Sequence, residues 1–204
     1  MSPEDETKQR IIQGAAQVFA QKGYEGATTR AIAQAAGVNE VTLFRHFGNK
    51  KNIFMAVIER FSALPGLEAA MQDQLTGDYR QDLTTLGTHF LQTMLKRRKS
   101  ILMSLCTAER LPEIRDVVAQ PPTEQQQMLS GYLRQQIERG VVRDLPSPEL
   151  AAKLFFGMLF EFAISQPLIA GTPIERMPPE EVVAQMVDIF VRGTIKPPEE
   201  SGTG

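Results

Sequence analysis

The sequence predicts an all-α protein, on three observations. Apolar residues recur at helical spacing (i, i+3, i+4, i+7) in nearly every segment. Ser, Thr or Asn precedes many of these segments and Gly or Pro follows, as at helix starts and stops. No run alternates apolar and polar residues as a half-buried strand would. With 204 residues, 42% of them hydrophobic, the chain is long enough to bury a core.

Four short helices are expected in the first 62 residues. Their predicted N-caps are Thr7, Thr28, Asn39 and Asn49. Gly23 and Gly37 are expected to end the first and second helices, because glycine readily adopts the left-handed backbone of a helix stop. The "LPG" at 64–66 then interrupts the pattern and suggests a domain boundary.

Further helices are expected over ranges that Pro and Gly separate: 80–97, 100–109, 122–140, 148–166 and 179–194. The breakers between them begin at Leu111, Gln120, Leu145 and Gln166. The predicted organisation is a first helical domain over 1–62, a larger helical domain over 63–196, and a disordered tail over 197–204 that has no apolar anchor.

Composition argues against several classes of protein. One cysteine, Cys106, excludes an internal disulfide, and two distant histidines provide no cluster at metal spacing. No Gly-rich phosphate loop or catalytic constellation is present, so neither an enzyme nor a cofactor is expected. The start of the chain lacks the apolar region of a signal peptide, and no apolar run approaches the roughly 20 residues of a membrane span. A cytoplasmic protein is expected.

The second and third helices, joined by a turn containing Gly37, fit a helix-turn-helix. Arg30 and Lys50 lie in first helical turns, where the helix dipole disfavours a cation unless an anion is also present. A DNA phosphate is such an anion, and it could be held by backbone N–H groups and the cation together. The alternative is that both are solvated surface charges.

The stretch "TTRAIAQAAGVNEVTLFRHFGNKKNIF", from Thr28, resembles the DNA-binding signature of the TetR family of one-component bacterial transcriptional regulators. The resemblance is strong over roughly residues 8–60. Beyond them, the helical layout and the stretch "ERGVVRDLPSPELAAKLFFGM" from Glu138 resemble the family's run into its dimer helices. The resemblance implies a homodimer that binds an operator in double-stranded DNA and responds to a small-molecule effector. It makes 1–62 the helix-turn-helix DNA-binding domain and 63–196 the effector-binding and dimerisation domain.

Carried over by position, the resemblance implies a set of DNA-binding residues: Thr28, Thr29, Arg30, Asn39, Glu40, Thr42, Phe44, Arg45, His46 and Lys50. Two departures from the family pattern matter. Phe44 replaces the usual Tyr and so lacks a hydroxyl for phosphate, while Glu40 and Val41 replace a polar or basic residue followed by Gly or Pro. An acidic side chain repels phosphate unless it accepts from a cytosine amino group, so Glu40 could either read a cytosine or point away.

In the resembled family, the larger domain encloses a pocket for a small, often apolar inducer. The residues spaced to line such an interior are Phe90, Met94, Leu102, Met103, Cys106, Met128, Tyr132 and Phe155. For each of them, ordinary core packing is the alternative.

The last two helices are apolar on more than one face, which suggests that they bury their surplus against a second copy of the chain. Burial within a monomer is the alternative. The expected function is therefore a homodimeric, ligand-responsive repressor of a pseudo-palindromic operator. The competing hypotheses are a DNA-binding regulator without an inducer, and a helical enzyme or lipid carrier whose N-terminal motif is vestigial.

Overall fold

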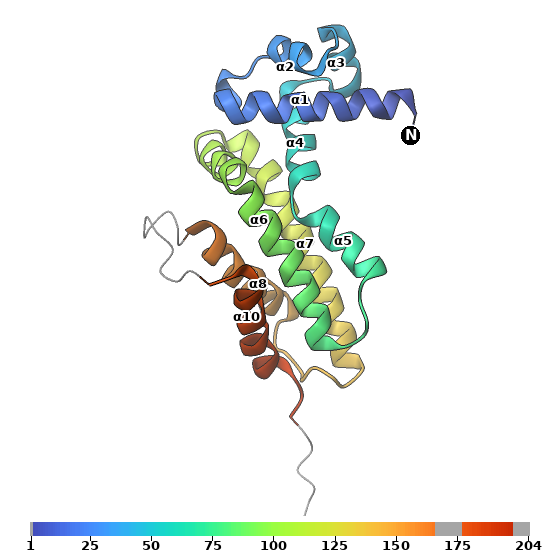
Figure 1. Ribbon diagram of the computed structural model, residues 1–204, viewed down its shortest axis with the longest axis vertical. Coiled ribbons are helices and arrows are strands. Elements are labelled where there is room, and N and C mark those ends of the chain that lie inside the picture. Colours follow the sequence, from blue (N-terminus) through green and yellow to red (C-terminus); the bar gives the residue numbers. More distant parts are fainter. Residues whose placement is uncertain (1, 166–176, 198–204) are drawn as a thin grey trace, which may run out of the picture. The chain divides into compact units, whose positions relative to one another are not determined.

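The computed structural model describes residues 2–165 and 177–197. Within these residues the chain is helical and forms no strand, apart from one isolated antiparallel bridge between Val142 and Ile195. The helices shown in Figure 1 are α1 (Pro3–Gly26), α2 (Thr29–Ala36), α3 (Glu40–Phe47), α4 (Lys50–Phe61), α5 (Leu64–Asp73), α6 (Tyr79–Arg110), α7 (Pro112–Glu138), α8 (Pro148–Phe160), the π-helix η1 (Glu161–Ser165) and α10 (Pro179–Thr194). The all-α prediction is confirmed.

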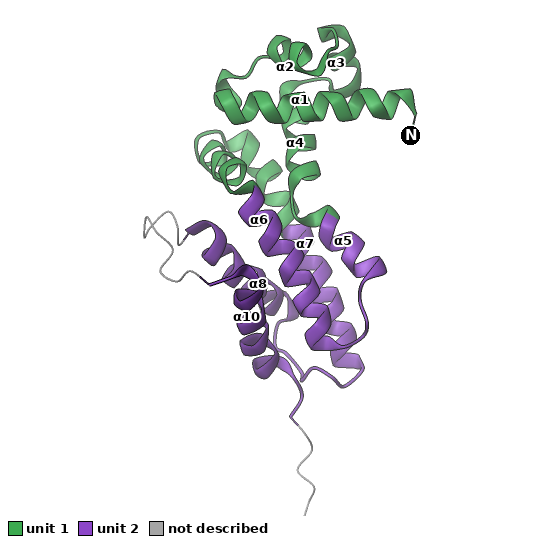
Figure 2. Ribbon diagram, in the orientation of Figure 1, with its two compact units in different colours: residues 1–65, 97–122 green, residues 66–96, 123–204 purple. Residues whose placement is uncertain are grey.

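The chain packs as two compact units (Figure 2). Unit 1 contains residues 1–65 and 97–122, and unit 2 contains residues 66–96 and 123–204. This division differs from the predicted domains 1–62 and 63–196, because residues 97–122 pack with the N-terminal helices. Most of the predicted tail, residues 198–204, lies outside the described residues, as does most of the predicted loop from Gln166.

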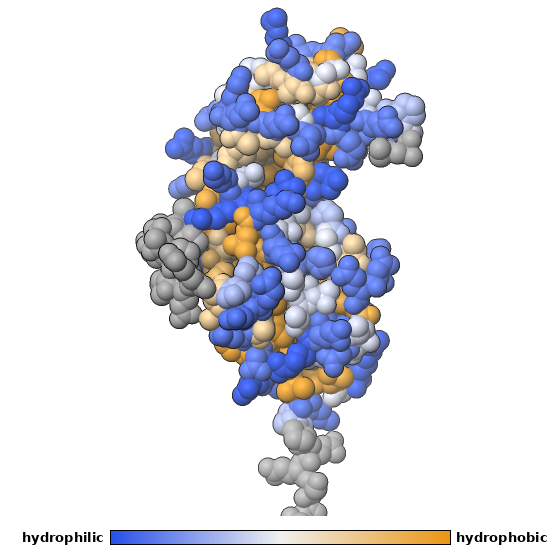
Figure 3. All heavy atoms as spheres, viewed as in Figure 1, coloured by the Kyte–Doolittle hydropathy of each residue, from blue (hydrophilic) through white to orange (hydrophobic). Residues whose placement is uncertain are grey.

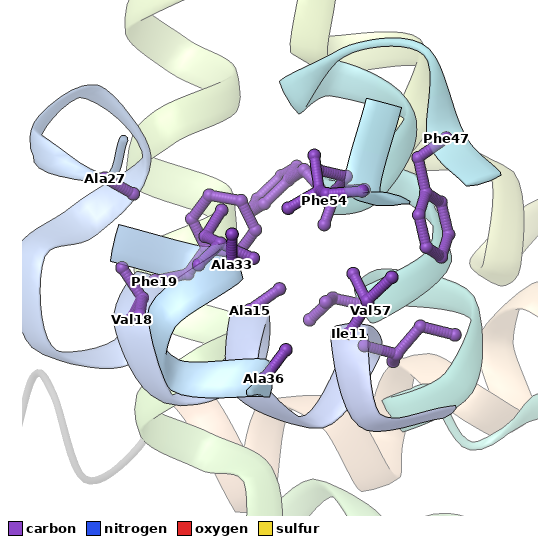
Figure 4. Packing of buried hydrophobic residues seen from close by; sticks show 14 of the residues in the cluster. Ile11, Ala15, Val18, Phe19, Ala27, Ala33, Ala36, Phe47, Phe54 and Val57 are labelled. Carbon is purple, nitrogen blue, oxygen red and sulfur yellow. The ribbon is translucent and has the colours of Figure 1, made fainter. Parts of the chain in front are cut away.

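The core of unit 1 is an apolar cluster contributed by α1, α2, α3 and α4 (Figure 4). Phe19 and Phe54 meet edge to face at its centre, with 5.0 Å between ring centroids, and Tyr24 packs 4.9 Å from Phe54. Ile114 and Val117 of α7 complete the cluster, which explains why this later part of the chain belongs to unit 1. Burying each of these large side chains stabilises the fold by about 1.5–3 kcal/mol.

A glycine sets how closely α1 approaches α2. A Cβ atom added at Gly14 would lie 2.8 Å from the backbone nitrogen of Ala36 and 3.0 Å from the carbonyl carbon of Ala35. Both atoms are backbone, so no side chain can move aside to make room. Glycine at this position therefore permits the close packing on which the helix-turn-helix rests.

The predicted start of the first helix is wrong. Ser2, not Thr7, is the N-cap, and it forms a reciprocal capping box with Asp5. The Thr7 hydroxyl instead donates to the Pro3 carbonyl within the first turn of the helix. Gly23 does leave helical geometry, with φ at 68°, but one further turn follows it before α1 ends at Gly26.

The chain does break near "LPG" at 64–66, between α4 and α5, and the first segment of unit 1 ends at Pro65; α5 itself was not predicted. Two predicted interruptions of later helices are wrong. The expected helices 80–97 and 100–109 are one helix, α6. Helix α7 continues through Pro121 and Pro122, although each proline removes a backbone N–H donor. Ile114, Val117 and Pro121 are buried at i, i+3 and i+7, so the same face of α7 stays buried from its start to the prolines.

The core of unit 2 is built from the first part of α6, the second part of α7, and α8 and α10. Gly87 of α6 lies where an added Cβ would be 3.1 Å from Val183 of α10 and 3.4 Å from the Phe155 ring of α8. Phe155 also meets Phe190 edge to face at 5.1 Å between centroids. The range predicted as one helix, 148–166, is α8 followed by η1, and α10 has the bounds predicted for the last helix.

Candidate nucleic-acid interface

Local capping contacts build the helix-turn-helix of α2 and α3. The Thr28 hydroxyl accepts the amide N–H of Ala31 (3.1 Å), and the Asn39 side chain accepts that of Thr42 (2.7 Å). Between the helices, Gly37 adopts the left-handed conformation with φ at 65°, and the Val38 amide donates back to the Ala33 carbonyl. These contacts confirm the predicted caps and the predicted turn.

Helix α3 has one buried face and one exposed face. Leu43 and Phe47, at i and i+4, are buried in the core of unit 1. Val41, Phe44 and Arg45, at i, i+3 and i+4, are exposed and form what we call the outer face of α3. The exposed fraction of Val41 is 77% and that of Phe44 is 46%. A helix supported on one side and open on the other can enter a major groove.

Glu40, at the start of α3, is bound within the protein. Its Oε1 accepts a hydrogen bond from the Thr29 hydroxyl at 2.6 Å. The bond links the first residue of α2 to the first residue of α3 and leaves Glu40 half-buried. It also fixes where this negative charge lies beside the outer face. Sequence reasoning named both residues but missed the bond between them, which depends on how the two helices pack.

Lys50 is paired with carbonyl groups. Its Nζ donates to the carbonyl oxygens of Tyr24 (2.9 Å) and Ala27 (3.1 Å) at the C-terminal end of α1, and lies 4.5 Å from the centroid of the Tyr24 ring. Carbonyls at a helix C-terminus carry partial negative charge, so they supply the partner that a cation in the first turn of α4 needs. Arg30, by contrast, is exposed on α2.

His46, another of the predicted DNA-binding residues, is half-buried at the end of α3. Its Nε2 is buried and has no hydrogen-bond partner among the described residues. Together with Arg45 it lines an open hollow whose other wall is the first turn of α1, from Pro3 to Thr7. This hollow therefore extends from Arg45, on the outer face of α3, to the start of α1.

The residues predicted to line an effector pocket do not fall in one unit. Phe90, Met94, Met128, Tyr132 and Phe155 belong to unit 2, and all but the half-buried Met128 are buried there. The other three, Leu102, Met103 and Cys106, belong to unit 1. Met103 packs against the apolar cluster of that unit, and Cys106 is exposed.

Unit 2 contains a buried polar network that sequence reasoning missed. The Asp82 carboxylate accepts hydrogen bonds from the amides of Thr76 (2.7 Å) and Gly77 (3.2 Å) and from the Tyr132 hydroxyl (2.8 Å). The Tyr79 hydroxyl shares a 2.8 Å hydrogen bond with Thr194 of α10. Burial raises the pKa of Tyr79 to about 12, and burial together with the Asp82 carboxylate raises the pKa of Tyr132.

An apolar stripe runs along α8 and α10. Leu150 and Leu154 on α8 and Ile189 on α10 are exposed, with exposed fractions of 54%, 57% and 66%. Gly157 and Gly193 continue the stripe at i+3 and i+4, and an added Cβ at either would meet nothing within 4 Å. The view in Figure 3 shows a mainly hydrophilic surface with smaller apolar areas, so exposed apolar residues grouped on two helices stand out from their surroundings.

Nowhere in the described part of the chain do three His, Cys, Asp or Glu side chains gather as a metal site would require. None of its helices combines the length and the apolar character needed to cross a bilayer.

Comparison with known sequences gives two family matches. Residues 11–57 match the family described as bacterial regulatory proteins, tetR family, and residues 81–193 match the C-terminal domain described as that of AefR-like transcriptional repressors. The HTH-type transcriptional regulator YvkB of Bacillus subtilis is 30% identical over 187 residues, which cover 92% of this chain and 96% of YvkB.

Solved structures share the fold. A TetR-family regulator from Mesorhizobium loti superposes with a TM-score of 0.76 at 20% identity, covering 96% of this chain and 100% of the other. The Bacillus subtilis regulator FadR, solved in complex with stearoyl-CoA, superposes with a TM-score of 0.71 at 19% identity, covering 91% and 98%. The capped helix-turn-helix, the two family matches and the full-length relative together establish that this chain belongs to the TetR family of bacterial transcriptional regulators.

Proposed function

We propose that this regulator is a homodimeric repressor that binds a pseudo-palindromic operator and is released from it by a small apolar ligand. The observation that carries the proposal is the outer face of α3. Val41, Phe44 and Arg45 project from a helix held on its other side by the core of unit 1. Arg45 at this face and Arg30 on α2 supply positive charge for the DNA backbone or for guanine.

The apolar stripe on α8 and α10 supports the dimer. A second copy of the same stripe would remove Leu150, Leu154 and Ile189 from water, and the glycines in it would allow close helix approach. A dimer presents two α3 helices, which read half-sites about 34–36 Å apart on one face of the duplex. A pseudo-palindromic operator follows from that symmetry.

The buried aromatic and methionine residues of unit 2 support an apolar effector, and Phe90, Met94 and Phe155 are the best placed of them. The neighbour FadR, which shares the fold, was solved with stearoyl-CoA, and this favours a ligand that carries an acyl chain. Ligand and operator oppose each other through a coupling free energy, typically about 1–3 kcal/mol.

The test of DNA binding is fluorescence anisotropy on DNA from upstream of the protein's own gene, with scrambled duplex as competitor at matched salt. We expect binding that survives excess competitor. If it does not, selection from random duplexes follows, and a failure to enrich any sequence would refute the proposal. A promoter–reporter fusion then assigns the sign of regulation: loss of the protein raises transcription for a repressor and lowers it for an activator.

The test of the effector is thermal unfolding with acyl-CoAs of increasing chain length, with coenzyme A alone as control. A ligand that binds only the folded protein raises the melting temperature in proportion to the logarithm of its concentration. We expect that rise to depend on chain length, and we expect the same compounds to displace the operator. A stabilising compound that leaves operator affinity unchanged would separate ligand binding from regulation.

A further inference from the structure

We infer that Val41 is a specificity-determining residue that packs against the 5-methyl group of a thymine in the operator. This inference rests on the proposed function, because it requires α3 to lie in the major groove. It assigns to Val41 a role that the sequence resemblance did not, since Val41 lies outside the expected DNA-binding set.

The first argument is exposure. At 77%, Val41 has the largest exposed fraction among the large exposed hydrophobic residues of the described chain. It lies in the first turn of α3, and the N-terminal residues of a recognition helix are those that contact base edges. Phe44 and Arg45 follow one turn later on the same face, so Val41 leads a row of side chains directed away from the core.

The second argument is that the two polar side chains that precede Val41 are already bonded within the protein. Asn39 accepts the Thr42 amide at 2.7 Å, and Glu40 accepts the Thr29 hydroxyl at 2.6 Å. The first fully exposed side chain within α3 is therefore apolar. The thymine methyl group is the apolar feature of the major-groove edge, and side-chain methyl groups are its usual partners.

The test uses uracil, which differs from thymine in the major groove only by the missing methyl group. Selection from random duplexes first yields the operator, and each thymine in one half-site is then replaced in turn by deoxyuridine. For the unmodified protein we expect one thymine whose replacement weakens binding about fourfold, the cost of one lost buried methyl contact. For Val41→Ala, thymine and uracil at that position should bind equally, within about twofold.

Leu105→Ala is the matched control, because it also shortens an exposed apolar side chain of unit 1, 41% exposed, on α6 instead of α3. It should retain the full uracil penalty. If Val41→Ala keeps that penalty, or if no thymine shows one on a strongly selected operator, the inference is overturned and DNA binding by the protein stands. If no sequence is enriched, the proposed function fails and the inference fails with it.

Discussion

Two surfaces of this protein expose apolar side chains, and their surroundings differ. On the outer face of α3, Val41 and Phe44 stand beside Arg45 on an eight-residue helix. On the apolar stripe of α8 and α10, the exposed side chains are those of Leu150, Leu154 and Ile189, and Gly157 and Gly193 lie on the same stripe. An apolar side chain next to a cation suits DNA, a polyanion that carries thymine methyl groups. An apolar side chain next to glycine suits another helix, because glycine allows a helix to approach closely. The residues around each apolar surface therefore indicate the kind of partner that it suits.

The two surfaces are also supported differently. The outer face of α3 is braced by half-buried polar bonds near solvent, Thr29 to Glu40 and Lys50 to the end of α1. Helix α10 is held by a buried bond, Tyr79 to Thr194. The predictions below disturb each surface and its support separately, from the largest expected effect to the smallest.

Leu154→Asp should abolish dimerisation and weaken operator binding by about a hundredfold or more, because it would bury an unpaired carboxylate between two copies. Sedimentation velocity measures the first effect and anisotropy the second. Leu154→Met keeps an apolar side chain of similar volume and should remain a dimer. A Leu154→Asp protein that still sediments as a dimer would show that the stripe on α8 and α10 is not the dimer interface.

Alkaline pH should lower the free energy of unfolding, because it first ionises the unfolded chain's Tyr79, whose hydroxyl bonds to Thr194 of α10 in the folded protein. The pKa of Tyr79 is raised from 10.0 to about 12. Between these values the unfolded chain loses the phenolic proton while the folded protein keeps it, so stability falls as pH rises, by roughly 2–3 kcal/mol over the window. Urea unfolding at pH 9 and pH 11.5 measures the loss. Tyr79→Phe should reduce it, and the raised pKa of Tyr132 accounts for part of what remains.

Lys50→Ala should lower the free energy of unfolding by about 2 kcal/mol, because two half-buried carbonyls lose a charged donor. Lys51→Ala, at an exposed neighbour, is the control and should change stability little. Operator binding across a salt titration then tests the role expected from the sequence. If Lys50 contacts phosphate, its removal weakens binding to every sequence and flattens the salt slope; an unchanged slope would assign it to support alone.

Glu40→Gln should strengthen operator binding about threefold without altering base preference. The amide oxygen can still accept the Thr29 hydroxyl, while the charge that repels phosphate is gone. Selection from random duplexes with both proteins compares their preferences. A change confined to one base pair would mean that Glu40 reads a cytosine.

Local chemistry explains what the sequence could predict. Thr28, Asn39 and Asn49 cap helices through amides only three residues away, so their roles are visible in any short window. The start of α1 was missed because Thr7 and Ser2 are both plausible caps, and only Ser2 has Asp5 three residues later to complete a capping box. α7 was predicted to begin only at Pro122, because tertiary packing by Ile114 and Val117 is not a local signal.

The sequence named candidate site residues but could not indicate the hydrogen bonds that the structure gives them. Lys50 looked unpaired from sequence because Tyr24 and Ala27, whose carbonyls accept its hydrogen bonds, are more than twenty residues away. Asp82 and Tyr132 are likewise fifty residues apart. No periodicity or motif indicates such contacts, since each depends on the packing of two whole helices.

Gly14 has a consequence for how this regulator could acquire a new operator. The outer face of α3 is open to solvent, so Val41, Phe44 and Arg45 can vary with little effect on folding. Position 14 is different, because even a methyl group there would collide with the backbone of α2. The exposed side chains of α3, which we propose to read the operator, can therefore change with little effect on folding, while the crossing of α1 and α2 at position 14 requires glycine.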